Sequence, residues 1–301
     1  MQEQDGVIVV NKHAGVTSFD IVFKIKKLFN TKKVGHTGTL DPMATGVLPI
    51  LIGRSAKASE YLTAHDKAYV AEITLGITTD TEDISGKILE KSATLPTKEA
   101  FFKACEAMVG EIEQIPPMYS ALKVDGKKLC DLAREGIEIE RKARSITVYK
   151  IEPKCIDEEK GVYEMYVKCS KGTYIRTLCA DIGKMLGCGA CMSKLERVES
   201  GNFKIDDAYT LDELEKMTYE ERISALAPTE SLFIELDNVI LPDFYARLAR
   251  SGCEIYQHKI KSSYPIDTFV RMSDKNGFFA LGQVRQYENG TAIKAVKLFV
   301  L

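Results

Sequence analysis

The spacing of hydrophobic side chains in the first quarter of the chain changes between the period of a strand and that of a helix. Residues 7–10 form a short β-rich run. Thr17 and Ser18 then supply an N-cap before a stretch whose apolar side chains have helical spacing, at Phe19, Val22, Phe23, Ile25, Leu28 and Phe29. A glycine-rich loop at 35–46 leads into the apolar run 47–52, and residues 68–75 alternate like a strand.

The middle of the chain continues this mixture. Residues 98–109 have the pattern of a helix closed by Gly110, and residues 119–124 that of a strand before an Asp125-Gly126 turn. The pattern then predicts a helix at 128–135, strands at 145–151 and 162–169, and a helix at 174–186. Strands separated sometimes by turns and sometimes by single helices favour an α+β fold, a mixed, largely antiparallel sheet with flanking helices, over a doubly wound fold.

The pattern changes near residue 233. An acidic helical stretch at 211–226 ends at Pro228. Beyond it lie one short helix, at 244–251, and brief strands with turns at Asn276-Gly277 and Asn289-Gly290. We therefore predict two domains, residues 1–232 and a small β-rich domain at 233–301.

The net charge and the distribution of charge along the chain point to different partners. A net charge of -2 and a pI near 6.2 argue, taken alone, against a nucleic-acid partner. Residues 21–36, however, hold five lysines and no acid, while residues 206–221 hold seven acids against Lys216. Such segregation is expected if one face meets RNA and another stays in water.

Several functional classes receive no support from the composition. No apolar run approaches the roughly 20 residues of a membrane helix, and the N-terminus lacks the pattern of a signal peptide. We expect a cytoplasmic, monomeric protein with no membrane contact. The eight cysteines are too few for a disulfide scaffold, and the Cys188 and Cys191 pair lacks the further ligands of a zinc site, so no metal is expected.

The glycine-rich loop is the strongest candidate for chemistry. It holds three glycines, three threonines, a proline and a single carboxylate, that of Asp41. Such a backbone can approach a ligand closely, and the spacing matches neither a P-loop nor a dinucleotide fingerprint. From the local sequence alone, an Asp before Pro is also a common turn starter, and His36 could be a loop histidine without a function.

The stretch GHTGTLDPMATGVLPI resembles the signature of the TruB family of tRNA pseudouridine-55 synthases. The resemblance recurs in order along the chain, in GVIVVNKHAGVTS at 6–18, KAYVAEITLG at 67–76, QIPPMYSALKVDGKKLCDLAREG at 114–136 and SKGTYIRTLCADIG at 170–183. There are departures as well. Asn11 and His13 stand where the family usually has Asp and Pro, and Cys130 replaces a usual tyrosine.

The resemblance implies a pseudouridine synthase fold with a C-terminal domain that is PUA-like and binds RNA. It implies that the enzyme isomerises uridine 55, in the T-arm loop of tRNA, to pseudouridine. Asp41 would be catalytic, Arg176 would pair with it, and Tyr69 would stack on the target base. The other substrate-binding residues that it implies are Tyr174 and Leu195 lining the pocket, Lys12 bracing the loop, and His36 lying against the T-loop of the RNA.

The chemistry that the resemblance implies suits these residue types. Isomerisation exchanges a C1'–N1 for a C1'–C5 bond without redox change or water, so no small-molecule cofactor is expected. Extruding a stacked uridine costs a few kcal/mol, and stacking on a ring such as Tyr69 returns roughly 1–3 kcal/mol. Arg176 is expected to keep the pKa of Asp41 low, and an ionised Asp41 could act as a base or as a nucleophile.

Four lysines are candidates for contacts with the RNA backbone. Lys24 and Lys27 lie three residues apart and share one helix face, while Lys32 and Lys33 lead directly into the glycine-rich loop. The alternative is a solvated helix surface that touches no ligand.

Other classes of function stay open from the residues themselves. A noncatalytic RNA-binding factor could use the same basic face, although it has no use for a carboxylate facing phosphates. A nucleosidase would use a carboxylate and a trapped water to hydrolyse the bond. An Arg176–Asp41 pair could also merely fix the fold, with Tyr69 and Tyr174 as half-buried structural residues.

Overall fold

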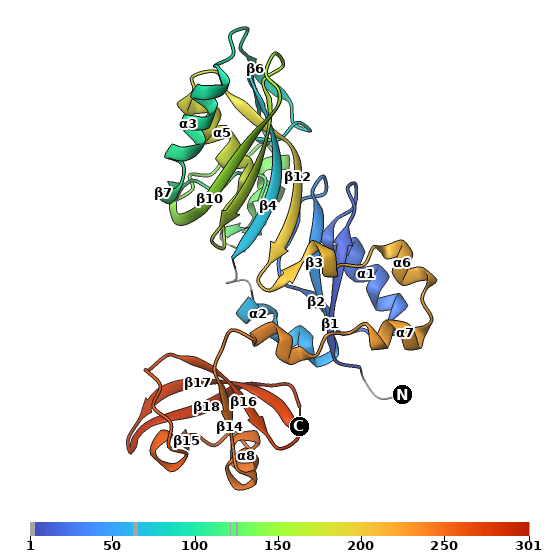
Figure 1. Ribbon diagram of the computed structural model, residues 1–301, viewed down its shortest axis with the longest axis vertical. Coiled ribbons are helices and arrows are strands. Elements are labelled where there is room, and N and C mark those ends of the chain that lie inside the picture. Colours follow the sequence, from blue (N-terminus) through green and yellow to red (C-terminus); the bar gives the residue numbers. More distant parts are fainter. Residues whose placement is uncertain (1–3, 63–65, 121, 125, 301) are drawn as a thin grey trace.

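The computed structural model describes residues 4–62, 66–120, 122–124 and 126–300. Figure 1 shows an elongated molecule with a large sheet at one end and a smaller sheet at the other. The large sheet has nine strands. Its main path runs through β1 (Gly6–Lys12), β3 (Thr45–Ile52), β12 (Ala190–Ser200), β4 (Lys67–Leu75), β11 (Val162–Cys169), β10 (Arg144–Asp157) and β7 (Gly110–Gln114).

The predicted mixed, largely antiparallel sheet is confirmed. Two short strands lie off the main path, β2 (Val34–His36) on β3 and β13 (Phe203–Lys204) on β12. Neighbouring strands are antiparallel except β3 and β12, which run parallel where Thr45 meets Glu196. This parallel pair brings the glycine-rich loop, which precedes β3, beside β12.

Strand β1 is buried on both faces, which explains its continuous run of apolar residues. Ile8 and Val10 belong to the main core, together with the inner face of α1 (Ser18–Leu28). Val7 and Val9 point to the opposite face and pack in a second cluster, which includes residues of the C-terminal part of the chain.

Helix α1 begins as predicted. The Thr17 side chain accepts from Asp20 N, and the Asp20 carboxylate accepts from Thr17 N, which makes a capping box. The buried face is narrower than predicted, because Phe19 and Phe23 are 69% and 54% exposed. The sheet therefore accommodates the middle stripe of this helix and leaves the two rings outside.

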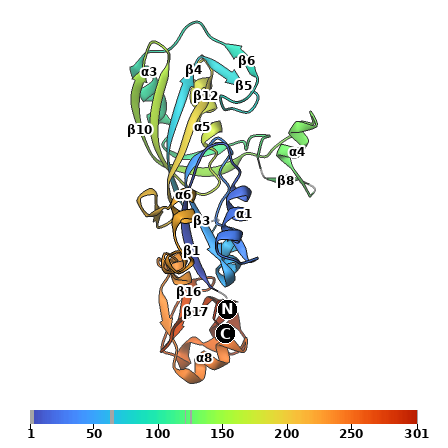
Figure 2. The ribbon, with the colours of Figure 1, turned by 90° about the vertical axis from the view of Figure 1, so that its right-hand side faces the viewer.

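Further helices cover the other half of the large sheet. Helices α3 (Lys98–Ala107) and α5 (Ile175–Met185) pack there, close to their predicted bounds, and β5 (Ile77–Thr79) pairs with β6 (Ile88–Lys91). The strand predicted at 119–124 is wrong in its extent, since among the described residues of that range only Lys123–Val124 form a strand, β8. With β9 (Lys127–Lys128) and α4 (Leu129–Arg134) it projects from the body in Figure 2. Asp125 of the predicted turn lies outside the described residues.

Strand β12 was not predicted, although it lies at the centre of the sheet. Its sequence ACMSKLERVES mixes charged and apolar residues without a clean alternation. Register shifts in its pairing with β4, between Met192 and Lys194 and between Arg197 and Glu199, interrupt the period of two. A pattern search along the chain misses a strand that is bulged twice.

The acidic stretch forms two helices instead of one. Helix α6 (Leu211–Lys216) ends before Thr218, which caps α7 (Tyr219–Ser224) by a capping box of its own with Glu221. A turn of 3-10 helix at Thr229–Phe233 then leads to the small sheet.

The small sheet has five strands in the order β14 (Asn238–Ile240), β16 (Phe269–Asp274), β17 (Gly277–Tyr287), β18 (Gly290–Leu298) and β15 (Ile255–Tyr256). Helix α8 (Asp243–Arg250) packs against it. The turns at Asn276-Gly277 and Asn289-Gly290 join long strands, where brief ones were predicted. Among the helices of the described part of the chain, none is long and apolar enough to cross a membrane.

Candidate active site

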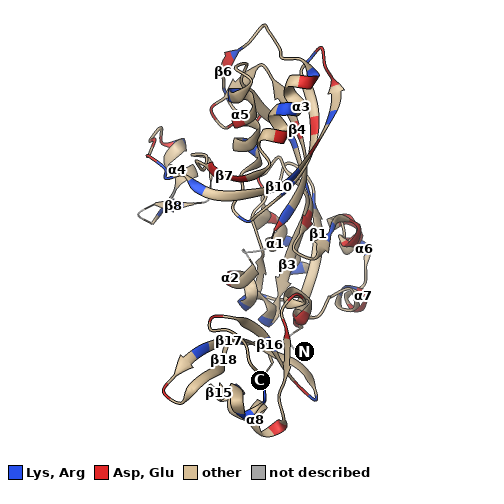
Figure 3. Ribbon diagram, turned by 60° about the vertical axis from the view of Figure 1, so that its left-hand side comes forward, with Lys and Arg blue, Asp and Glu red and all other residues tan. Residues whose placement is uncertain are grey.

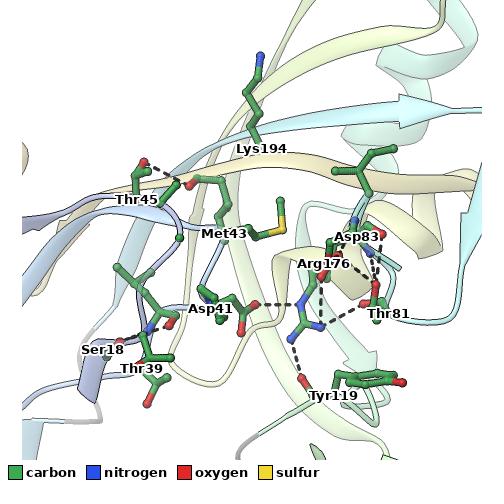
Figure 4. Close-up of a pocket in the computed structure, with 18 of the residues that line it drawn as sticks. Ser18, Thr39, Asp41, Met43, Thr45, Thr81, Asp83, Tyr119, Arg176 and Lys194 are labelled. Atoms are coloured by element: carbon green, nitrogen blue, oxygen red, sulfur yellow. Dashed lines mark hydrogen bonds and ion pairs between the residues drawn. The ribbon is translucent and has the colours of Figure 1, made fainter. Parts of the chain in front are cut away.

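A cleft with a volume of about 1310 Å³ opens beside the glycine-rich loop. Figure 4 shows the side chains that converge on it from the loop, the β5–β6 turn, β12 and α5. A smaller cavity of about 110 Å³ adjoins it. That cavity is lined by Thr39, Leu40, Asp41, Tyr69, Thr173, Tyr174, Ile175, Arg176 and Leu195.

Buried polar groups fix the position of the loop. Lys12 Nζ donates to the carbonyls of Pro42, His13 and Val16 at 3.2, 3.0 and 2.9 Å, as expected of a bracing residue. Burial lowers the pKa of Lys12 to about 8. Ser18 Oγ accepts from Leu40 N at 2.9 Å, which ties the start of α1 to the same loop.

The end of the loop requires glycine. Gly46 has a φ of 100°, and a Cβ at this position would lie 2.2 Å from the carbonyl oxygen of Arg197. This close approach allows β3 and β12 to pair directly beside the loop. The loop conformation thus depends on a strand 150 residues further along the chain.

Asp41 meets Arg176 at the floor of the cleft. The carboxylate Oδ2 lies 2.9 Å from Arg176 Nε, and the two side chains are 36% and 5% exposed. Arg176 also donates from Nη2 to the Tyr119 carbonyl at 2.8 Å and from Nη1 to the Thr81 carbonyl at 3.1 Å. Asp83 Oδ2 lies 3.7 Å from Nη1. These contacts hold the guanidinium in one plane, facing Asp41 (Figure 4).

Asp41 has a raised pKa, contrary to the expectation from the sequence. Burial raises it above the ordinary value of 3.8, the Arg176 charge opposes this change, and the negative charge of Asp83 adds to it. The expected effect of Arg176 is therefore present but smaller than the loss of hydration. A carboxylate with a raised pKa is a better proton acceptor than an exposed one.

Tyr69 and Arg197 form a buried pair behind the small cavity. Tyr69 is a buried residue of β4, and burial raises the pKa of its phenol to about 12. The nearby charge of Arg197 opposes this change. Arg197 Nε donates to Val47 O at 2.7 Å and its Nη2 donates to Gly38 O at 3.2 Å, which fixes the guanidinium against the loop.

Tyr174 and Leu195 complete the cavity, as expected. Tyr174 is the N-cap residue of α5, and Gln114 brackets its backbone, accepting from Tyr174 N at 2.8 Å and donating to Tyr174 O at 3.1 Å. Burial raises the pKa of its phenol. Leu195 is buried in β12.

His36 lies at the edge of the large cleft, at the end of β2. Burial lowers the pKa of its ring, and the positive charge of Arg197 lowers it further. Its Nδ1 accepts from Gly38 N at 3.3 Å. The His36 ring is therefore neutral where it lines the cleft.

Three site residues were missed by the sequence analysis: Asp83, Gln114 and Arg197. Each is a polar residue that is nine-tenths or more buried and that contacts the expected site residues. Gln114 falls within the long block shared with the family, which could have drawn attention to it. Asp83 and Arg197 carry no local signal, because their partners are distant in sequence.

The expected separation of basic and acidic faces is wrong at α1. Lys24 forms an ion pair with Glu215 of α6 at 3.3 Å, and Figure 3 shows the acidic α6 beside this part of the molecule. Lys27 Nζ lies 4.6 Å above the centre of the Phe23 ring. Lys32 and Lys33 are exposed between α1 and β2.

The two cysteines of the C-x-x-C stretch make separate contacts. Cys188 Sγ donates to Gly189 O at 3.2 Å, while burial raises the pKa of Cys191 to about 11, which disfavours the thiolate that a metal would need. Within the described ranges, no group of three or more His, Cys, Asp or Glu side chains could hold a metal ion.

Comparison with known proteins adds an independent line of evidence. The N-terminal domain model of the TruB family of pseudouridylate synthases matches residues 26–175, and the C-terminal domain model of tRNA pseudouridylate synthase B matches residues 176–243. The tRNA pseudouridine synthase B of Clostridium kluyveri is 41% identical over 98% of this chain and 100% of its own length. That of Alkaliphilus oremlandii is 47% identical over 88% of this chain and 85% of its own length.

Solved structures agree on the fold. A chain from a Cbf5-Nop10-Gar1 complex has a TM-score of 0.77 and 28% identity, and covers 99% of this chain and 85% of its own length. A chain from the archaeal box H/ACA sRNP Nop10-Cbf5 complex has a TM-score of 0.72 and 26% identity, and the match covers 99% of this chain and 86% of that one. Both match the large and the small sheet together.

Proposed function

The chain belongs to the TruB family of pseudouridylate synthases, and from this we propose that it isomerises uridine 55 in the T-arm loop of tRNA, with Asp41 as the catalytic carboxylate. The enzyme is a tRNA pseudouridine synthase, an isomerase that exchanges a C–N for a C–C glycosidic bond. The observation that carries the assignment to Asp41 is its contact with the buried Arg176 at the mouth of a cavity walled by tyrosine.

We assign the small cavity to the uridine that the enzyme flips out of the RNA. A base stacked inside an RNA fold is out of reach, so the enzyme extrudes it at a cost of a few kcal/mol. Stacking on the Tyr69 ring offsets roughly 1–3 kcal/mol of that cost. Because the Tyr69 side chain is already buried, little further ordering is needed when the base arrives.

Asp41 then faces the ribose and the base at once. The C1'–N1 bond breaks, the uracil turns, the C1'–C5 bond forms, and N1 takes up a proton while C5 loses one. Asp41 acts either as a base on the ribose or as a nucleophile, and Arg176 orients it in both cases. No cofactor takes part in this proposal.

Surrounding residues hold the RNA. Lys12 keeps the Asp41 loop in place, and His36 lies against the T-loop from the edge of the cleft. Lys24 and Lys27 of α1, with Lys32 and Lys33 between α1 and β2, contact the RNA backbone. Leu195 and Tyr174 exclude water from the base.

The test uses unmodified tRNA and the intact protein. We expect a carbodiimide-dependent reverse-transcription stop at position 55 and an unchanged RNA mass. The Asp41→Asn variant should bind tRNA and give no stop, because an amide neither accepts a proton nor attacks.

Each alternative gives a different result in this experiment. Loss of the base from the RNA would identify a nucleosidase, and binding without any product would identify an RNA-binding factor. Turnover by the Asp41→Asn variant would falsify the role of Asp41.

A further inference from the structure

The turn between β5 and β6 contains an acidic residue that the proposed chemistry does not use, Glu82. Its φ is 62°, in the left-handed region that residues other than glycine rarely adopt. Its two neighbours both face Arg176, the Thr81 carbonyl at 3.1 Å and the Asp83 carboxylate at 3.7 Å from Nη1 (Figure 4). The conformation of Glu82 therefore sets two of the contacts that orient the guanidinium.

Two elements hold this turn from opposite sides. On the β12 side, Met192 N donates to Glu82 O at 3.0 Å, and Ile84 N donates to Met192 O at 2.9 Å. On the α5 side, Thr177 Oγ1 donates to Glu82 Oε2 at 2.5 Å. Thr177 is buried and directly follows Arg176 in α5. The bond thus joins the turn and the helix one residue away from the Arg176 contacts.

The surroundings of Glu82 favour keeping this bond. Burial raises the pKa of Glu82, the Thr177 hydroxyl and the Arg176 charge lower it, and Asp181 and Arg141 act in opposite directions at longer range. A carboxylate that has lost water keeps its remaining donor, because an unsatisfied buried acceptor is costly. An L residue stays in the left-handed region only where its surroundings hold it there.

We propose that Glu82 is a positioning residue: through Thr177 it holds the left-handed turn so that Thr81 and Asp83 keep Arg176 facing Asp41. Glu82 itself lines neither the large cleft nor the small cavity. The inference rests on the proposed function of Asp41. It predicts a loss in the step after RNA binding, with the binding step preserved.

The test separates rate from affinity in four variants. We expect Glu82→Ala and Thr177→Val to lower the single-turnover rate of pseudouridine formation about tenfold, because misplacing a catalytic group by a fraction of an ångström costs rate. Their Kd for tRNA should stay within about twofold of wild type, since neither residue lines the RNA cleft. Glu82→Gln keeps an acceptor and Thr177→Ser keeps a donor, so both should retain the rate within about twofold.

Two further variants and a control sharpen the test. Glu82→Gly removes the side chain and relaxes the backbone, since glycine adopts positive φ freely, and we expect it to be as slow as Glu82→Ala. The double variant Glu82→Ala, Thr177→Val should be no slower than either single variant, because both remove one shared bond. Glu90→Ala, exposed on the neighbouring β6, is the matched control and should behave as wild type.

The thermal unfolding of each variant is measured together with its single-turnover rate, to show that the variant is folded. If Glu82→Ala does not fold, Thr177→Val carries the test, because it exchanges a hydroxyl for a methyl group of similar size. Wild-type rates in Thr177→Val and any folded Glu82→Ala overturn the proposal, as does equal loss in the Gln and Ser variants. A wild-type protein that makes no pseudouridine overturns the proposed function instead.

Discussion

At the Asp41 carboxylate, two physical effects act in opposite directions. Loss of hydration raises its pKa, and the guanidinium of Arg176, 2.9 Å away, lowers it. Asp83 shares the same guanidinium and adds repulsion. The contact with Arg176 therefore orients the Asp41 carboxylate, and the carboxylate remains a good proton acceptor.

The raised pKa predicts the acid limb of the pH profile. In the proposed reaction Asp41 acts in its ionised form, so the single-turnover rate should fall about tenfold per pH unit below its pKa, at a pH above the ordinary 3.8. Arg176→Gln removes the attraction that lowers this pKa. In that variant the acid limb should move to higher pH, in addition to a lower plateau. The measurement is the single-turnover rate against pH at saturating enzyme, with tRNA binding followed in parallel as the control. An acid limb that does not move in Arg176→Gln would show that another group titrates.

Among the elements, α1 best illustrates how context changes a pattern. Its lysines read as one basic face in the sequence, but Lys24 is paired with Glu215 and Lys27 lies over Phe23. An exposed ion pair contributes about 0–1 kcal/mol to stability, so it does not prevent Lys24 from turning to a phosphate. The ion pair does reduce the free energy that a contact between Lys24 and a phosphate adds to RNA binding.

This difference within α1 leads to a graded prediction. Replacing Lys24, Lys27, Lys32 and Lys33 with Gln should raise KM and flatten the salt dependence of tRNA affinity, by about 0.7–0.9 in slope per lost contact. The Lys24, Lys27 double variant should lose less affinity than the quadruple variant, because an RNA contact from either of these lysines replaces a partner within the protein. The rate for bound RNA should change little.

The matched control for charge is a Lys87→Gln, Lys91→Gln variant. Both of these lysines are exposed near β6, at the far tip of the large sheet (Figure 1). If the quadruple variant keeps the affinity and salt slope of wild type, α1 does not face the RNA.

Across the whole molecule, the two sheets share an apolar cluster. Val7 and Val47 of the large sheet pack with Leu232, Phe233 and Phe299 from the C-terminal part of the chain. Arg271 reinforces the junction with an ion pair to Glu230 at 2.7 Å. The proposed boundary between residues 232 and 233 therefore passes through a packed segment.

Truncation at two positions tests how the parts depend on one another. A chain ending at Ser231 loses Leu232 and Phe233, each worth roughly 1.5–3 kcal/mol of burial, whereas a chain ending at Leu236 keeps both. We expect the shorter fragment to unfold at lower temperature and denaturant concentration than the longer one. Both should bind tRNA more weakly than the full chain, and the longer one should retain some activity, because the proposed site residues precede residue 198. Equal stability of the two fragments, or an inactive folded longer fragment, would contradict this division of roles.

Local sequence determined most of the elements because their causes are local. The Thr17 and Asp20 capping box and the turns of the small sheet each depend on residues within a few positions. Family resemblance added Asp41, Tyr69, Arg176, Tyr174 and Leu195 as expectations, and their meeting in one cavity agrees with them, while their roles remain predictions.

The tertiary structure alone decided what depends on distant partners. The central position of β12, the contact of Asp83 with Arg176 and the bonds from Arg197 to the loop join segments about 90 to 160 residues apart, which no local period encodes. The raised pKa of Asp41 has the same origin, because burial is a property of the packed molecule. The pairing of Lys24 with Glu215 likewise arises only when α6 packs beside α1, since charges far apart in sequence meet only through the fold.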